Sequence, residues 1–149
     1  MAGDHHGDIG DHSDLVFVFM TPRQVQELLF SVYPQTRDRF VVEDVGEKLL
    51  RMRMCIAERD LRPGETISGP SMFTLADCAF YALVMVLKEG QVQAVTTNVN
   101  INFMRRPTMG DLWAEARMLK LGSRLAVGDV LIRSGETDVA HASLTYALV

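Results

Sequence analysis

Residues 72–89, MFTLADCAFYALVMVLKE, restrict the possible fold of this 149-residue chain more than any other segment. The segment has the length of a helix and is apolar on almost every side, so we expect a helix that is buried all round. Ser71 precedes it as a candidate N-cap residue and Gly90 follows it as a terminator. The apolar stretch is shorter than the roughly 20 residues of a membrane span and contains Asp77, so a core helix is expected rather than a membrane contact.

The remainder of the sequence consists mainly of strand-like segments. Four of them follow the helix and are separated by turns rich in Gly, Pro and Ser: residues 92–104, 111–121, 124–133 and 137–149. Upstream, the patterns predict a short helix from Thr21-Pro22 to Tyr33, a hairpin of residues 40–45 and 48–56, and a long loop over residues 59–70. One buried helix and about six strands predict an α+β fold in which an antiparallel sheet wraps around a central helix.

The strand predicted within residues 92–104 has two different faces. Val95, Thr97, Val99 and Ile101 alternate with Thr96 and three asparagines. Regular alternation places the first set on the core and the second on a face that is polar or meets a partner subunit. We therefore expect a homo-oligomer.

The formal charge of −4 belongs to residues 1–14, which hold four aspartates and no Lys or Arg. The residues after them carry 15 acidic and 15 basic side chains without a long basic stripe, so nucleic acid is not an expected partner. Residues 1–14 predict a flexible leader, and residues 15–149 predict a single domain. The leader lacks the pattern of a secretory signal, and Cys55 and Cys78 are interpreted as reduced core thiols, so a cytoplasmic location is expected.

Several reaction classes are excluded because their motifs are missing. The sequence has no phosphate-binding loop, no dinucleotide fingerprint and no H-E-x-x-H pattern, and no metal site is expected. Three of the four histidines lie in the leader, which leaves His141 for the body of the chain. His141 is interpreted as a packed or edge residue of the last strand, because no partner for acid–base work is spaced beside it.

Asp77 is the strongest candidate for chemistry, because it is the one acidic or basic side chain in more than four turns of apolar helix. A buried carboxylate is costly unless hydrogen-bond donors meet it. Two interpretations remain open: a general base or nucleophile in a dry pocket, or a structural carboxylate that ties down loop amides.

The loop before the helix is a candidate anion site. Ser68, Gly69 and Pro70 bring backbone amides to the positive end of the helix dipole, where an oxyanion is stabilised. Gly69 allows close approach and keeps its N–H, whereas Pro70 has none. The alternative is an ordinary flexible loop.

Two basic clusters flank predicted turns. Arg105 and Arg106 end one strand, and Lys120 and Arg124 surround the turn at Gly122-Ser123. Arginine and lysine at such positions suit phosphate groups, although solvated surface residues have the same pattern.

A family resemblance covers about Val41–Val149. The stretch GPSMFTLAD at Gly69–Asp77 is similar to the H-G-G-x-x-x-x-L-A-D motif of hotdog-fold thioesterases, and the chain most resembles their PaaI-like acyl-CoA thioesterase group. A second similarity joins Val99–Pro107 to the short segments Gly110-Asp111-Leu112 and Ala114-Glu115-Ala116.

The resemblance implies an acyl-CoA substrate bound at a subunit interface of a dimer or a dimer of dimers, and no separate cofactor because CoA is part of the substrate. It implies that Asp77 is general base or nucleophile, that the Gly69 N–H polarises the thioester carbonyl, and that Thr96 orients water. Substrate contacts are then expected from Arg62, Phe73, Arg105, Arg106, Lys120 and Arg124.

The sequence departs from this family at the helix start. Ser68 stands where the family has His, Pro70 replaces its second Gly, and residues 60–67 offer no Asn or Gln; Arg62 lies near that position. Loss of one oxyanion donor lowers rates by about 10²–10³. These departures favour, as an alternative to hydrolysis, a non-catalytic acyl-CoA-binding oligomer. A hotdog dehydratase is a second alternative, although dehydratases of this fold pair a His with a carboxylate and Ser68 stands at the loop position.

Overall fold

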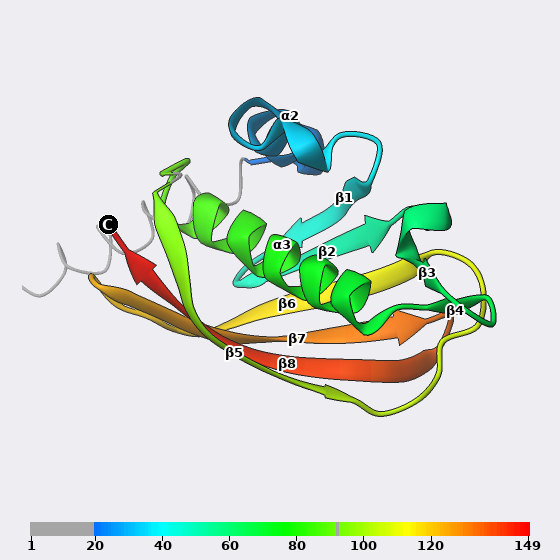
Figure 1. Ribbon diagram of the computed structural model, residues 1–149. Helices are drawn as coiled ribbons and strands as arrows, with labels where there is room; N and C mark the ends of the chain where they lie inside the picture. Colours follow the sequence, from blue (N-terminus) through cyan, green and yellow to red (C-terminus); the bar gives the residue numbers. More distant parts are fainter. Residues whose placement is uncertain (1–19, 92) are drawn as a thin grey trace, which may run out of the picture.

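The computed structural model describes residues 20–91 and 93–149 (Figure 1). The predicted leader, residues 1–14, lies outside the described residues. The described elements are α2 (Pro22–Val32), η1 (Pro34–Thr36), β1 (Phe40–Gly46), β2 (Leu49–Met54), η2 (Glu58–Asp60), β3 (Leu61–Arg62), β4 (Thr66–Ile67), α3 (Gly69–Leu87), β5 (Ala94–Phe103), β6 (Leu112–Leu121), β7 (Leu125–Ser134) and β8 (Thr137–Leu148).

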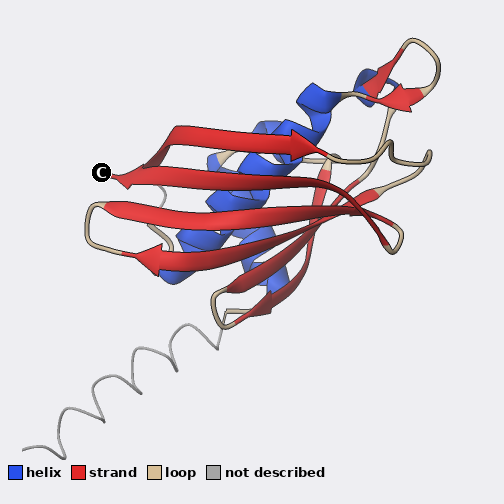
Figure 2. Cartoon of the chain, turned by 90° about the horizontal axis from the view of Figure 1, so that it is seen from below, coloured by secondary structure: helices blue, strands red, loops and turns tan. Residues whose placement is uncertain are grey.

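The six long strands form one antiparallel sheet that curves around α3 (Figures 1 and 2). The strand order is β1-β2-β6-β7-β8-β5, so β1 and β5 are the edge strands. The predicted α+β architecture of a sheet wrapped around a central helix is therefore confirmed, and the last four predicted strands match β5 to β8 closely.

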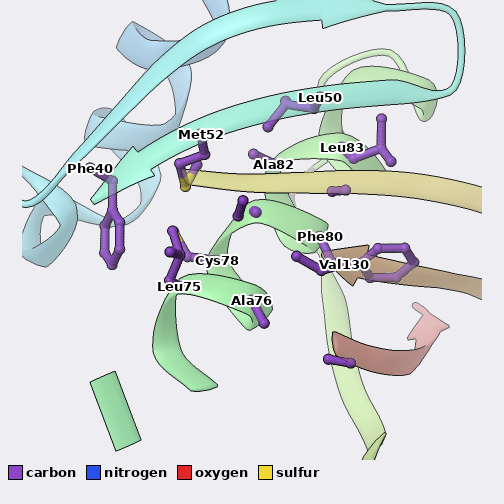
Figure 3. Packing of buried hydrophobic residues seen from close by; sticks show 14 of the residues in the cluster. Phe40, Leu50, Met52, Leu75, Ala76, Cys78, Phe80, Ala82, Leu83 and Val130 are labelled. Carbon is purple, nitrogen blue, oxygen red and sulfur yellow. The ribbon is translucent and has the colours of Figure 1, made fainter. Parts of the chain in front are cut away.

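Helix α3 is the core of the molecule. Its buried residues include Leu75, Phe80 and Leu83, which pack on inward side chains of β2, β6 and β7 (Figure 3). By length and composition α3 also meets the criteria for a membrane span, as core helices do. Burial of most of its side chains under the sheet accounts for its all-round apolar sequence.

The helix starts earlier than predicted. It begins at Gly69 rather than after Ser71, because Ser68 is the N-cap residue and its Oγ accepts the Ser71 N–H at 3.2 Å. Proline is compatible with the first helical turn, where the N–H has no intrahelical partner, so Pro70 does not delay the start. The predicted loop 59–70 is also more ordered than expected, since it contains η2 and the small β3–β4 hairpin.

Helix α2 starts as predicted at Thr21, which forms a reciprocal capping box with Gln24. It packs against β1 and is fastened by Gln26, whose side chain bonds the backbone of Phe40 and Val42. The segment between α2 and β1 is thereby held beside the middle of α3, where it lines the candidate site described below.

An irregularity in β5 overturns the predicted alternation. The register with β8 shifts between Thr96 and Asn98, so one extra residue is accommodated in β5. Thr96 therefore faces α3, as Val99 and Ile101 do further along, while Val95 is 56% exposed. This shift brings a polar strand residue to the helix.

Candidate functional site

The Asp77 carboxylate is held by two hydroxyl groups from the sheet. Thr96 Oγ1 on β5 donates to Asp77 Oδ1 at 2.8 Å, and the Tyr146 hydroxyl on β8 donates to the same oxygen at 2.6 Å. Among the described residues the second oxygen, Oδ2, accepts no hydrogen bond. Asp77 itself is half-buried, so this carboxylate has one restrained oxygen and one open oxygen.

Tyr146 is almost completely buried, with 2% of its surface exposed. Burial, followed by the adjacent Asp77 carboxylate, raises the pKa of Tyr146 far above its ordinary value of 10.0. The phenol therefore keeps its proton across the physiological range and remains a donor. The neighbouring Cys78 thiol is also neutral, because burial raises its pKa to about 12.

Asp77 opens into a cavity of about 300 Å³ between α3, β5 and the segment that joins α2 to β1. Aromatic and polar side chains line it together: Tyr33, Gln35, Thr36, Arg39, Phe40, Thr74, Asp77, Cys78, Tyr81, Ala94, Thr96 and Tyr146. A cavity of about 300 Å³ with both aromatic and polar walls has room for a small organic group.

The N-terminus of α3 is built around a buried carboxylate that sequence reasoning did not single out. Asp60 is fully buried; its Oδ1 accepts from the Ser71 hydroxyl at 2.8 Å and from Arg39 Nη2 at 2.9 Å, and its Oδ2 accepts the Ala57 N–H. Burial alone would raise the pKa of Asp60, but these hydrogen bonds outweigh burial and hold its pKa below the ordinary value.

Ser68 is fixed by this same network, and Gly69 follows it directly in the chain. The Asp60 carbonyl accepts the Ser68 N–H at 2.7 Å, and the Ser68 hydroxyl is engaged with Ser71. Gly69 lies in the first turn with the ring of Phe103 across it, where an added Cβ would lie 3.3 Å from that ring. A substituent there would narrow the approach to the Gly69 N–H.

Gly69 opens toward two surface cavities and not toward Asp77. One, of about 810 Å³, brings Gly69 together with Arg62, Arg105 and Arg106, which sequence analysis had proposed as substrate contacts. The other, of about 460 Å³, is lined by Gly69, Phe73 and Phe103 with neighbouring residues. Three predicted cationic residues therefore share one cavity with the predicted oxyanion donor.

Gly69 and Asp77 are eight residues apart on one straight helix. At 1.5 Å rise per residue their separation along the axis is roughly 12 Å. A carbonyl attacked at Asp77 lies much closer to that residue than this, so within one chain the Gly69 N–H does not reach it. The structure therefore places these two predicted site residues in separate cavities.

Lys120 and Arg124 lie elsewhere. They flank the β6–β7 turn, at the opposite end of the sheet from the turn that follows β5 and carries Arg105 (Figure 1). Within one chain, Lys120 and Arg124 line neither of the two cavities at Gly69, and they do not line the cavity at Asp77.

His141 lies on β8, which is an interior strand of the sheet, and its side chain is 38% exposed, so the interpretation as a packed or edge residue is wrong. It lies on the sheet face away from α3, where its Nε2 is 3.0 Å from Asp129 Oδ2 and Asp129 also pairs with Arg117. The hydrogen bond from the Arg117 guanidinium lowers the pKa of Asp129; burial acts in the opposite direction, and the contact with His141 lowers the pKa further. In the described residues no group of three or more His, Cys, Asp or Glu side chains could hold a metal ion.

Sequence reasoning missed Tyr146, Asp60 and Arg39. For Tyr146 one signal existed: a tyrosine among alternating apolar residues of a buried strand needs a partner for its hydroxyl. Asp60 ends the short η2 and Arg39 directly precedes β1, and their pairing across 21 residues has no local signature.

Comparisons with known proteins identify the family and the fold. Residues 64–141 match the thioesterase superfamily profile. A crystal structure from Silicibacter sp. TM1040, provisionally named a thioesterase, is 44% identical; the match covers 87% of this chain and 92% of that chain, with a TM-score of 0.80. A provisionally named esterase of Thermoplasma acidophilum is 23% identical over 105 residues, covering 70% of this chain and 79% of its own.

More distant structures share the fold. The PaaI protein from the phenylacetic acid degradation operon of E. coli is 19% identical with a TM-score of 0.73, over 87% of this chain and 96% of that chain. Both the sequence match over more than half of the chain and the closely similar bacterial structure lead to one conclusion. The chain belongs to the thioesterase superfamily and has its hotdog fold.

Proposed function

We propose that the protein hydrolyses the thioester bond of a small aryl or acyl-CoA, with Asp77 as the reacting carboxylate. The single observation that carries the proposal is the state of that carboxylate. Thr96 and Tyr146 hold one of its oxygens, no described residue donates to the other, and Asp77 lines a cavity of about 300 Å³. By contrast, the fully buried Asp60 accepts hydrogen bonds on both of its oxygens.

In the proposed reaction Asp77 Oδ2 takes a proton from water, and the resulting hydroxide attacks the thioester carbonyl carbon. The carbonyl electron pair moves to oxygen, where the Gly69 N–H at the positive end of α3 stabilises the oxyanion. Collapse of this intermediate breaks the C–S bond, and the leaving thiolate takes the proton from Asp77 to give CoA and a carboxylic acid. Direct attack by Asp77 on the carbonyl is the alternative first step.

The axial distance between Gly69 and Asp77 favours a site assembled from two copies, one giving Gly69 and the other Asp77. Edge strand β5 supports such a pairing: its outer edge has no strand partner in the part of the chain that is described, and Val95 and Phe103 on it are 56% and 51% exposed. The proposed assembly is a homodimer or a dimer of dimers.

The cavity of about 810 Å³ at Gly69 is the proposed CoA site, because Arg62, Arg105 and Arg106 offer guanidinium groups to phosphate. Arg106→Ala is expected to raise KM for acyl-CoA several-fold and to leave hydrolysis of a truncated thioester without the nucleotide nearly unchanged. Equal losses on both substrates would contradict phosphate binding there.

The central experiment is Asp77→Asn, assayed on a panel of aryl and straight-chain acyl-CoA esters. We expect turnover to fall by at least about 10³-fold, with the circular dichroism spectrum and the melting temperature retained. Full activity in this variant would overturn the mechanism. A wild-type protein that binds acyl-CoA without hydrolysing any ester would instead support the non-catalytic binding function, which the loss of the Pro70 N–H favours.

A single turnover in H₂¹⁸O separates the two first steps. Direct attack forms a mixed anhydride with loss of the thiolate, and water that opens this anhydride at the Asp77 carbonyl leaves ¹⁸O in the Asp77 side chain. General base catalysis places ¹⁸O only in the released acid, so label in Asp77 establishes direct attack. Mass spectrometry of the peptide that contains Asp77 measures the difference.

A further inference from the structure

We propose that Tyr146 is a positioning residue for hydrolysis, whose hydroxyl fixes the Asp77 carboxylate so that Oδ2 alone faces the substrate. The inference rests on the proposed function of this site and adds a residue from the last strand to it. The contact is direct: the Tyr146 hydroxyl lies 2.6 Å from Asp77 Oδ1. That is the length of a charge-assisted O–H···O⁻ hydrogen bond.

The hydroxyl has one proton and two nearby acceptors. The Asp77 backbone carbonyl lies 2.8 Å away, and the Asp77 carboxylate oxygen lies 2.6 Å away. The shorter distance and the negative charge favour donation to the carboxylate. Because the pKa of Tyr146 is raised, the proton stays on the phenol oxygen and is shared with the carboxylate only as a hydrogen bond.

Two donors on one oxygen determine how the carboxylate is presented. Thr96 and Tyr146 come from different strands and converge on Oδ1, which restricts rotation of the Asp77 side chain about its last torsion. That torsion is otherwise broad for aspartate. A fixed carboxylate holds Oδ2 at one position in the cavity, which lowers the entropic cost of reaching the reacting geometry.

The Tyr146 ring is itself held in place. It meets the edge of Phe80 with ring centroids 5.1 Å apart and an interplanar angle of 77°. Phe80 fills the space left by the missing side chain of Gly128 on β7. The hydroxyl is therefore positioned by packed apolar groups, and removal of its oxygen alone leaves this packing intact.

The test compares Tyr146→Phe with Thr145→Val. Thr145 adjoins Tyr146 on β8 but points to the opposite face of the sheet, so its substitution removes a neighbouring hydroxyl without touching Asp77. We expect Tyr146→Phe to lower kcat by about 10- to 100-fold while KM for acyl-CoA and the Kd of a non-hydrolysable thioether analogue stay within about twofold. Thr145→Val is expected to leave all three values within about twofold.

Thr96→Val gives a second measurement at the same oxygen. The loss in kcat for the double variant with Tyr146→Phe is expected to differ from the product of the two single losses, because both groups act through Oδ1. A wild-type kcat for Tyr146→Phe would overturn the inference. So would a parallel loss of folding or of analogue binding, since either assigns the hydroxyl to the structure of the fold.

The two proposals fail in different ways. If Asp77→Asn is inactive and Tyr146→Phe has wild-type kcat, the positioning role alone is wrong. If Asp77→Asn retains full activity, the proposed mechanism is wrong. The positioning role of Tyr146 is then wrong as well, because the carboxylate that it contacts takes no part in the reaction.

Discussion

Asp60 and Asp77 are carboxylates in the same fold with opposite arrangements. Asp60 is fully buried and each of its oxygens accepts hydrogen bonds, whereas Asp77 is half-buried and has one open oxygen. The first arrangement stabilises charge in the folded state, and the second leaves charge available to a ligand. We therefore assign Asp60 a structural role, whereas Asp77 keeps the reactive role proposed for it.

Asp60→Asn is expected to destabilise the protein by about 3 kcal/mol at pH 7, because Arg39 and Ser71 lose a charged acceptor inside the fold. Urea unfolding followed by circular dichroism measures the difference. Asp44→Asn, an exposed aspartate on β1, is the matched control and is expected to change stability by less than about 0.5 kcal/mol.

The same residue makes stability depend on pH. The pKa of Asp60 is lowered in the folded state from its ordinary value of 3.8, so the folded protein keeps the carboxylate ionised where the unfolded chain binds a proton. Its stabilisation is complete above that value and is lost as the pH falls from there through the folded-state pKa. The difference in free energy of unfolding between wild type and Asp60→Asn is therefore expected to become smaller as the pH is lowered from 4 to 3. A difference that stays constant over this range would contradict the prediction.

Single residues differ in how far sequence alone identifies them. Asp77 and Gly69 stand out because an acid in an apolar helix and a glycine at a helix start are local anomalies. Asp60 and Tyr146 do not, because their roles come from partners 11 to 69 residues away. Local patterns therefore indicate the proposed reactive carboxylate and the candidate oxyanion donor but not the groups that hold them in place.

Among the strands, β7 depends on one glycine. An added Cβ at Gly128 would overlap the backbone oxygen of Arg117 on β6 and the ring of Phe80 on α3. The close approach of helix to sheet at this point is therefore possible only without a side chain. The same approach places Phe80 against Tyr146.

Gly128→Ala is expected to lower the free energy of unfolding by about 2–3 kcal/mol, because neither the backbone oxygen nor the packed ring has room to move. Gly46→Ala is the control, since its nearest neighbour would be a Leu49 carbon at 3.9 Å. Equal melting temperatures for the two variants would show that α3 is less tightly packed on β7 than described.

Elements were predicted well where periodicity is regular and less well where it breaks. The limits of β6, β7 and β8 follow from alternation and turn residues, and α2 follows from its Thr-Pro start. The N-terminus of α3 was placed too late, because Gly and Pro are typical of loops and only the hydrogen bond from Ser71 to Ser68 reveals the cap. The shift in β5 was missed, because a single extra residue has no clear sequence signal.

For the whole molecule, the central prediction is that two copies share each site. Asp77→Asn removes the carboxylate and Gly69→Pro removes the N–H, so each homodimer is expected to be inactive. In a mixed dimer, the Asp77→Asn subunit supplies an intact Gly69 N–H and the Gly69→Pro subunit supplies an intact Asp77, so one of the two sites is complete. Random exchange makes half of the dimers mixed, so about a quarter of wild-type activity is expected to return.

The mixture is prepared by joint refolding or by co-expression, and light scattering reports the oligomeric state. Circular dichroism of each variant alone confirms folding, since proline is tolerated in the first helical turn. No recovery from two folded variants that exchange subunits would contradict a shared site. A monomer in solution would contradict it as well.

The sequence by itself determined the order of elements along the chain: an apolar helix with strands before and after it in sequence. It also singled out one isolated acid within that helix, Asp77, and a glycine at the start of the helix, Gly69. These features are local, since helix and strand periodicities and cap residues act over a few neighbours. Only the tertiary structure decided which hydroxyls meet Asp77, which carboxylate anchors the helix start, and that Gly69 and Asp77 open into different cavities. Those relations depend on strand order and register, which are set by packing between residues far apart in the sequence.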